Sequence, residues 1–237
     1  MYVMENNMWN GKKKAITFSF DDGVTQDFRL VEMFNKYGLK GTFNLNSGVL
    51  GGKGELERNG RTVSHNKISA AEVKTLYLGH EIAVHTVNHP TLVGLPEEKI
   101  IFEVEEDRKT LEKLCGYPIV GMAYPNGPND DRVATIIQRN TTIRYARTVT
   151  STYSFKVQKE NLLRYNPTVY YIEDCFEEIV DKFLKSQDKD EQLLYIWGHS
   201  YEMDAGFISW EKFERICEKL AGKEDVFYGT NKEVLLQ

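Results

Sequence analysis

The sequence predicts an α/β fold built on a parallel sheet, and the number of repeats favours a barrel. Short apolar runs alternate with amphipathic helical segments along the 237-residue chain, a pattern that is typical of β-α units. Seven or eight such repeats in one chain of this length fit a barrel. Hydrophobic residues make up 41% of the chain and charged residues 27%, which is the composition of a globular protein with a substantial core.

The predicted strands are short apolar runs bounded by glycine, proline or polar residues. They span 15–20, 41–46, 81–86, 119–125, 144–149, 168–172 and 193–199, and a short final strand is expected at 226–229. Between the second and third runs lies a long glycine-rich segment, 47–67, that we expect to be a loop at the catalytic end of the barrel. Long loops in compact domains are often functional or disordered, so this one could shape a substrate groove or lack a fixed structure.

The predicted helices show apolar residues at helical spacing and recognisable ends. Gly38 is expected to cap the helix 26–37, and Ser69 with Glu72 forms a capping box for a helix that ends at Gly79. The remaining helices are expected at 96–115, 129–140 and 175–187, with a last one that begins at Ser209.

Composition excludes several classes of protein. A net charge of −5 argues against a nucleic-acid-binding surface, and no apolar run reaches the ~18–20 residues that a membrane span needs. The N-terminus, MYVMENNMWNGKKKA, lacks the apolar segment of a signal peptide. We therefore expect a cytoplasmic protein, or an extracellular one if a leader was removed, with an N-terminal extension at 1–14 and a single domain at 15–237. Its oligomeric state is not predictable from the sequence.

Reactive side chains fall at the ends of the predicted strands. Asp21 and Asp22 end the first strand, His85 ends the third with His89 just after it, and His199 ends the seventh. In parallel barrels the carboxyl ends of the strands open on one face, which carries the chemistry. These five residues are therefore expected to lie together.

The spacing H-x-x-x-H lets two histidines turn toward one ion. Alone, the pair His85 and His89 fits turn or partly exposed histidines equally well. A carboxylate from another strand end would complete a His₂-carboxylate site with an open position for water, as catalytic metal sites have. One aspartate would then be a ligand, and the other could stay off the metal as a base.

Four motifs in order, TFSFDDG, HTVNHP, AYPNG and LLYIWGH, resemble those of the polysaccharide deacetylase family (NodB homology domain, carbohydrate esterase family 4). The resemblance runs from about Ala15 to about Tyr201. It implies a distorted (β/α) barrel, often of seven strands, in a catalytic domain that hydrolyses N- or O-acetyl groups on sugars. It also implies a divalent metal, most commonly Zn²⁺, with Co²⁺, Ni²⁺ or Mn²⁺ as alternatives.

The resemblance also implies roles for individual residues. Asp22, His85 and His89 match the metal ligands, and Asp21 matches the general base. His199 matches the general acid of the motif L-x-I-x-x-H. The implied reaction is attack of a metal-bound water on the acetyl carbonyl, with Asp21 removing the proton and His199 protonating the leaving amine.

Two further motif positions bear on catalysis. The backbone N–H of Asn126 falls where the family places an oxyanion donor, whereas the arginine that commonly opens that motif is replaced by Ala123. The family's D-x-x-D-W motif is also absent. Our hypothesis is that Arg147, at the end of the fifth strand, reaches Asp21 in place of the missing arginine. The alternative is that Arg147 lies on the surface or pairs with another acid.

Aromatic residues near the strand ends are candidate sugar contacts. Tyr124, Trp197 and Tyr201 could stack on sugar rings, although aromatic residues are also common in cores. Glu202 could tune His199 by a hydrogen bond, although a solvated loop acid is the more common case.

The leading interpretation is a metal-dependent deacetylase of an N-acetylated carbohydrate. Deacetylation of acetylated xylan and amide cleavage on a small cyclic metabolite on the same site remain open. A sugar-binding protein that lost turnover also remains open, because Ala123 stands in place of the arginine. A glycosidase is weaker, since adjacent strand residues make a poor carboxylate pair and the histidines would stay unexplained.

Overall fold

The computed structural model describes residues 8–236 of the chain. The strands are β1 (Lys14–Asp21), β2 (Gly41–Leu45), β3 (Glu55–Arg58), β4 (Arg61–Ser64), β5 (Glu81–Val84), β6 (Gly121–Ala123), β7 (Tyr145–Arg147), β8 (Val169–Tyr170), β9 (Gln192–Gly198) and β10 (Val226–Tyr228). The helices are α1 (Asp27–Tyr37), α2 (Val73–Leu76), α3 (Glu97–Cys115), α4 (Asp131–Asn140), α5 (Phe176–Lys185), α6 (Tyr201–Asp204), α7 (Trp210–Leu220) and α8 (Asn231–Leu235), with short 3₁₀ turns η1 (Met8–Gly11), η2 (Ser47–Val49) and η3 (Leu162–Arg164).

The strands form one curled parallel sheet in the order β7-β6-β5-β2-β1-β9-β8, and β10 pairs with the first half of β1. Between its two edge strands, Tyr165 forms an isolated bridge with Arg147 of β7, and the chain then enters β8. This connection draws the edges together into a distorted barrel. The predicted fold class is confirmed.

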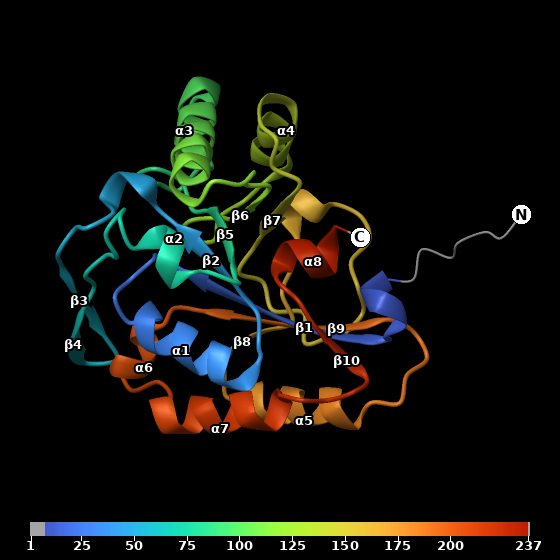
Figure 1. Ribbon diagram of the computed structural model, residues 1–237. Coiled ribbons are helices and arrows are strands. Elements are labelled where there is room, and N and C mark those ends of the chain that lie inside the picture. The colour runs from blue at the N-terminus through green and yellow to red at the C-terminus, as the bar shows by residue number, and fades with distance from the viewer. Residues whose placement is uncertain (1–7, 237) are drawn as a thin grey trace, which may run out of the picture.

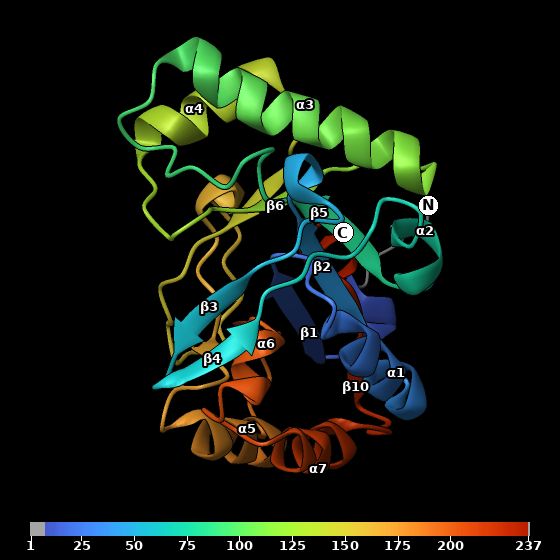
Figure 2. The same ribbon diagram turned by 90° about the vertical axis from the view of Figure 1, so that its left-hand side faces the viewer.

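Helices cover the outside of the sheet on two sides. Figure 1 shows α3 and α4 on one side and α1, α5 and α7 on the other, and Figure 2 shows the same two layers from the side. Phe18 and Phe20 of β1 point outward into this helix layer, where their rings pack on Phe34 of α1 and Phe213 of α7. The apolar side chains of β1 therefore anchor the helices.

The residues between those phenylalanines point into the barrel, because side chains alternate along a strand. Thr17 donates a hydrogen bond to Asn231 Oδ1 at 2.9 Å, and Ser19 accepts one from Asn44 Nδ2 at 2.9 Å. Asp21 is the next residue in this inward series. Inside the barrel, polar side chains of β1 thus bond to neighbouring elements.

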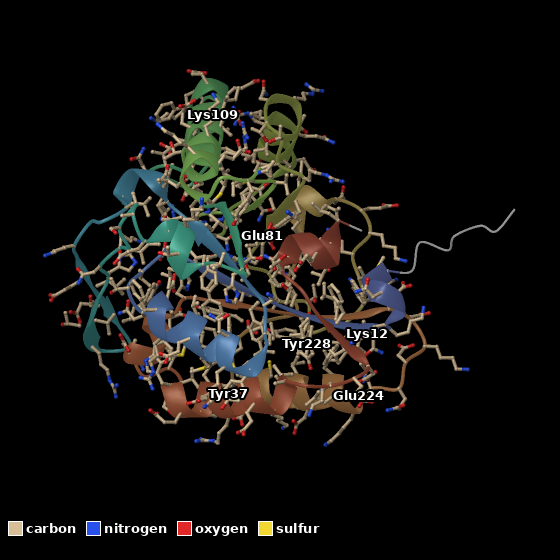
Figure 3. All side chains as sticks on the ribbon, viewed as in Figure 1. Lys12, Tyr37, Glu81, Lys109, Glu224 and Tyr228 are labelled. Atoms are coloured by element: carbon tan, nitrogen blue, oxygen red, sulfur yellow. The ribbon has the colours of Figure 1, made fainter. Side chains whose placement is uncertain are left out.

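The amino end of the barrel is closed by α8. Glu81, labelled in Figure 3, accepts hydrogen bonds from the Thr42 hydroxyl at 2.8 Å and the Lys232 backbone N–H at 2.9 Å. The Trp9 indole is buried and donates to the Val234 carbonyl at 3.1 Å. Residues 1–7 of the predicted N-terminal extension lie outside the described residues, and the division at 14 stays a prediction.

The expectation of a loop throughout 47–67 is wrong, because β3 and β4 form an antiparallel hairpin there. Most of its side chains are exposed, so the hydrophobic pattern of a strand is missing from the sequence. Only Leu56 and Val63 contribute to an apolar cluster, with Val24, Tyr201 and Ala205. The helix predicted to end at Gly79 is shorter than expected, since α2 forms one turn. Among the described residues no helix is long and apolar enough to cross a membrane.

Candidate active site

The two adjacent aspartates face the same point because the chain twists at the end of β1. Asp22 has a φ of 81° and Gly23 a φ of 57°, so the alternation of the strand stops at Asp21. A Cβ on Gly23 would lie 2.7 Å from Leu45 Cδ2, so a larger residue would have to displace the Leu45 side chain and adopt a left-handed backbone conformation. Both carboxylates come to 3.9 Å from Nε2 of His85.

Asp22, His85 and His89 form a group of three potential metal ligands. Asp22 Oδ1 lies 3.5 Å from His89 Nε2 and 3.9 Å from His85 Nε2, and the two Nε2 atoms are 3.2 Å apart. His85 donates its Nδ1–H to the Ala123 carbonyl at 2.9 Å, which leaves the Nε2 lone pair facing the group. Two ligands about 2.1 Å from a tetrahedral ion lie about 3.4 Å apart, so the donor set fits a divalent metal.

Asp22 also receives support from the segment after the hairpin. His65 Nε2 lies 3.3 Å from Asp22 Oδ2, and the Lys67 ammonium donates to the Asp22 carbonyl at 2.8 Å. Burial would raise the pKa of Asp22, but the His65 hydrogen bond and the charges of His199 and Lys67 hold that pKa well below its usual value. His65 and Lys67 were missed by the sequence reasoning, since nothing local links them to Asp22.

Two acids of α3 hold the histidine loop in place. Asp107 accepts backbone hydrogen bonds from Ser47 at 2.7 Å and His85 at 3.0 Å, and Glu103 accepts one from the Asn88 N–H at 2.9 Å. Both carboxylates are buried. Outer contacts of this kind fix the orientation of metal ligands. In the sequence they look like ordinary polar positions of an amphipathic helix.

Asp21 lies beside this group, and its carboxylate is bound by other residues. Oδ1 accepts a hydrogen bond from Asn44 Nδ2 at 2.8 Å, and Oδ2 accepts one from Arg147 Nη2. Burial acts to raise the pKa of Asp21, but the charge of Arg147, followed by those of His85 and His199, brings that pKa below its usual value. Asp21 is therefore ionised at neutral pH.

Arg147 is fully buried and held on several sides. Its Nε donates to Ser19 Oγ at 3.2 Å, its Nη1 donates to the Thr148 carbonyl at 3.0 Å, and its guanidinium carbon lies 4.5 Å from the centre of the Trp197 ring. In the sheet register, Arg147 of β7 is the direct partner of Ala123 of β6. The arginine thus stands one strand away from the position where the sequence motif lacks it.

His199 stands on the other side of Asp21, with its Nε2 3.9 Å from Asp21 Oδ2. Its Nδ1 lies 3.2 Å from Glu202 Oε1, and its backbone N–H donates to Glu202 Oε2 at 3.1 Å. Burial lowers the pKa of His199 and raises the pKa of Glu202 to about 8. Glu202 is almost completely buried, so the interpretation of it as a solvated loop acid is wrong.

Asn126 follows β6 at the rim and is exposed. Its φ is 60°, and its side-chain amide donates to Thr91 Oγ1 at 3.2 Å. Among residues 8–236, its backbone N–H has no hydrogen-bond acceptor. This N–H is thus free to bind an acceptor from outside the chain.

The expected stacking of three aromatic residues on sugar rings needs correction. Tyr124 is 1% exposed and donates its hydroxyl to the Leu163 carbonyl at 2.8 Å, so it is a core residue. Trp197 and Tyr201 are 5% and 2% exposed, and neither presents an open ring face. Tyr201 packs on His199 instead, with ring centres 5.0 Å apart.

A buried carboxyl next to the site predicts a pH-dependent stability. Asp27 of α1 accepts hydrogen bonds from Ser200 Oγ at 2.6 Å and the Tyr77 hydroxyl at 2.7 Å, and burial raises its pKa to about 7. The folded state therefore keeps a proton that the unfolded state loses near pH 4. Its stabilising effect is full below pH ~4 and is lost as the pH rises to ~7, on the order of 4 kcal/mol at most.

We expect Asp27→Asn to flatten this part of the stability profile, because the amide does not titrate. The amide can still hydrogen-bond to the same two hydroxyls through one donor and one acceptor. Urea unfolding between pH 4 and pH 8 measures the slope. The exposed Asp174→Asn serves as the control and should leave the slope unchanged. An Asp27→Asn profile as steep as that of the wild type would contradict the assignment.

Comparisons with known proteins agree on one family. A sequence model described as polysaccharide deacetylase matches residues 9–145, and no curated protein matches the chain. The Streptococcus pyogenes deacetylase PplD in complex with acetate is 23% identical over 62% of this chain and 61% of its own length, with a TM-score of 0.52. The match therefore spans less than two thirds of that protein.

Two other structures match nearly the whole chain. A family 4 acetyl xylan esterase from Clostridium thermocellum, in complex with a cobalt ion, is 14% identical over 94% of this chain and 90% of its own, with a TM-score of 0.58. A CE4 family pseudoenzyme from Bacillus anthracis, BA3943, is also 14% identical, over 94% of this chain and 66% of its own, with a TM-score of 0.54. The fold alone thus accommodates both catalytic and non-catalytic proteins. Because the family model matches more than half of its residues, this chain belongs to the polysaccharide deacetylase family.

Proposed function

We propose that the protein is a metal-dependent hydrolase that removes acetyl groups from an N-acetylated carbohydrate. One observation supports this most directly. A potential metal-binding group, Asp22 with His85 and His89, lies beside a second buried carboxylate, Asp21. Asp21 is hydrogen-bonded to Arg147 and is not part of that group. His199 approaches the same carboxylate from the other side.

Asp22, His85 and His89 would hold the metal, for which Zn²⁺ is the first candidate because it prefers such nitrogen and oxygen ligands. When bound, a divalent metal polarises an acetyl carbonyl and lowers the pKa of a water. The Asp22 carboxylate supplies the negative charge of the site, and the fixed tautomer of His85 supplies a neutral nitrogen.

Asp21 is the proposed general base. It is ionised and buried, and it keeps its orientation because Asn44 and Arg147 bind its two oxygens separately. As water attacks the acetyl carbon, Asp21 accepts the proton that the water gives up. Fixing the carboxylate in advance removes the need to reorganise the site during the reaction.

His199 is the proposed general acid on the opposite side. Glu202 holds its Nδ1, so its Nε2 points toward Asp21 and the site. In this role His199 acts in its protonated form, which burial disfavours, and it donates its Nε2 proton to the leaving amine when the C–N bond breaks. The backbone N–H of Asn126, which has no acceptor among residues 8–236, would donate a hydrogen bond to the oxyanion at the rim.

Release of acetate from defined substrates tests the proposal. We expect the purified protein, supplied with Zn²⁺, to release acetate from N-acetylglucosamine oligomers faster than it releases acetate from acetylated xylan. We also expect it to hydrolyse these oligomers faster than it opens a small cyclic amide. A preference for acetylated xylan or for the cyclic amide would support the proposed active site but contradict the proposed substrate. No hydrolysis of any of them, together with tight binding of a saccharide, would favour a sugar-binding protein instead.

Metal binding can be measured without turnover. We expect calorimetric titration with Zn²⁺ to show one site, and His89→Ala to weaken it by more than the ~10–100-fold that loss of an outer contact costs. His80→Gln is the control, because His80 precedes β5 at the amino end of the barrel and accepts a hydrogen bond from the Gly41 N–H. Equal affinity in the wild type and His89→Ala would show that these ligands do not bind the metal.

A further inference from the structure

Beneath the proposed base and acid lies one pair of stacked aromatic rings. Trp197 of β9 and Tyr170 of β8 have ring centres 4.0 Å apart and planes inclined by 19°. The two strands are parallel neighbours, and Tyr170 and Trp197 are direct register partners. The sheet itself therefore fixes the stack.

One ring of this pair contacts the arginine that binds Asp21. The Arg147 guanidinium carbon lies 4.5 Å from the Trp197 ring centre, within the range of a cation–π contact, and such a contact is strongest when it is desolvated. Both side chains are buried. Trp197 therefore limits the positions that the guanidinium can take while it binds Asp21.

The other ring contacts the glutamate that binds His199. The Tyr170 hydroxyl donates a hydrogen bond to Glu202 Oε1 and lies 3.4 Å from His199 Nδ1. Glu202 then contacts both the ring and the backbone of His199. The orientation of His199 thus depends on a carboxylate whose own position Tyr170 fixes.

These contacts form a closed ring of six side chains. It runs through Asp21, Arg147, Trp197, Tyr170, Glu202 and His199, and it closes where His199 Nε2 lies 3.9 Å from Asp21 Oδ2. We propose that Tyr170 and Trp197 are positioning residues that hold the acid His199 and the base Asp21 at one fixed relative orientation. A change at the residues that hold one of them then alters the other. This inference rests on the proposed function for its kinetic consequence, but its geometric content is independent of turnover.

Removing the Tyr170 hydroxyl tests the acid side of the ring. Tyr170→Phe keeps the ring that stacks on Trp197 and removes the two hydroxyl contacts, the hydrogen bond to Glu202 and the longer 3.4 Å contact with His199 Nδ1. We expect kcat to fall by about 10-fold or more while KM changes by less than about 2-fold, because proton transfer depends steeply on geometry. Long-range ¹H–¹⁵N NMR spectra of the imidazoles should show the ring nitrogens of His199 shifted and those of His80 unchanged.

Tyr228→Phe is the matched control. Tyr228, labelled in Figure 3, lies on β10 and donates its hydroxyl to the Leu220 carbonyl at 2.6 Å. The Tyr228→Phe variant loses the same kind of hydrogen bond, and Tyr228 does not contact the six side chains of the closed ring. We therefore expect kcat and the His199 signals to stay as in the wild type. Unchanged His199 signals in Tyr170→Phe would overturn the positioning role.

A double-mutant cycle tests the connection between the two sides. Tyr170→Phe and Arg147→Lys alter residues that share only Trp197 as a common neighbour in the ring. If Trp197 transmits the constraint, their effects on kcat should deviate from the product of the single effects by about 3-fold or more. Trp197→Phe, which keeps an aromatic face, should preserve most of the coupling, and Trp197→Leu should reduce it to the part that passes through His199 and Asp21.

Strictly multiplicative effects would show that the two sides are independent and would overturn the coupling. If the wild type releases no acetate from any substrate, the proposed function fails, and the cycle is then measured on the His199 NMR signals. If the shift of the His199 signals caused by Arg147→Lys differs between the wild-type and Tyr170→Phe backgrounds, the result supports the coupling. If the shift is the same in both backgrounds, it contradicts the coupling.

Discussion

Asp21→Asn is expected to lower kcat by about 10²–10⁴-fold, the range that a general base contributes, while the metal stays bound. Asparagine has the shape of aspartate but cannot accept a proton at neutral pH. The residues Asp22, His85 and His89 are untouched by the change. Acetate release measures the rate, and metal analysis of the purified variant measures the occupancy.

The neighbouring residue provides the matched control. Asp22→Asn should lose the metal and the activity together, because it removes the carboxylate ligand. Asp21→Asn also leaves the buried Arg147 without its counter-ion, so urea unfolding must show that the variant is folded under assay conditions. An Asp21→Asn protein with wild-type activity would require another base. Loss of metal from this variant would place Asp21 among the ligands.

The strand ends were predictable because they depend on local patterns. Each buried strand is a short apolar run, and parallel strands bring their carboxyl ends to one face. Asp21, Asp22, His85, His89 and His199 could therefore be grouped without knowing any contact. The structure brings the five together at the mouth of the barrel.

The supporting residues could not be predicted, because their partners are far away in the sequence. Lys67 meets Asp22 only after the hairpin folds back on Val24. Tyr170 meets Glu202 because β8 and β9 pair. Asn44 is one polar residue in an apolar run, and only the register of β2 with β1 shows that it bonds Asp21.

Burial explains the errors about polar and aromatic side chains. A glutamate three residues after a strand is usually solvated, but Glu202 is covered at the end of the barrel. Tyr124 stands at a strand end, yet its side chain turns into the core. Whether a rim residue faces the substrate or the protein depends on how the loops cover it, and these loops carry little hydrophobic pattern.

Arg147 is the residue whose loss should cost the most stability. It is completely buried and carries the charge opposite to Asp21. Breaking a buried ion pair by removing one partner destabilises by about 3–5 kcal/mol, because the remaining charge is left uncompensated. Arg147→Met should therefore lower the free energy of unfolding by about this amount and raise the pKa of Asp21, which weakens it as an ionised base.

One double variant tests whether the unpaired charge causes the loss of stability. Arg147→Met combined with Asp21→Asn should be closer to the wild type in stability than Arg147→Met alone, because no buried charge remains. Urea unfolding of the four proteins in this cycle gives the coupling energy. Additive stability losses would show that the pair does not act as a unit.

The register of the sheet offers a stricter test of what replaces the missing motif arginine. Ala123 and Arg147 are paired across β6 and β7, and registered neighbours in a parallel sheet place their side chains on the same face. Exchanging them in Ala123→Arg with Arg147→Ala conserves both volume and charge. We expect this exchange to recover activity and stability that Arg147→Ala alone loses, since a guanidinium from β6 can approach the same carboxylate. An exchanged protein no more active than Arg147→Ala would mean that Asp21 needs the direction of approach from β7, held on Trp197, and not merely a buried positive charge.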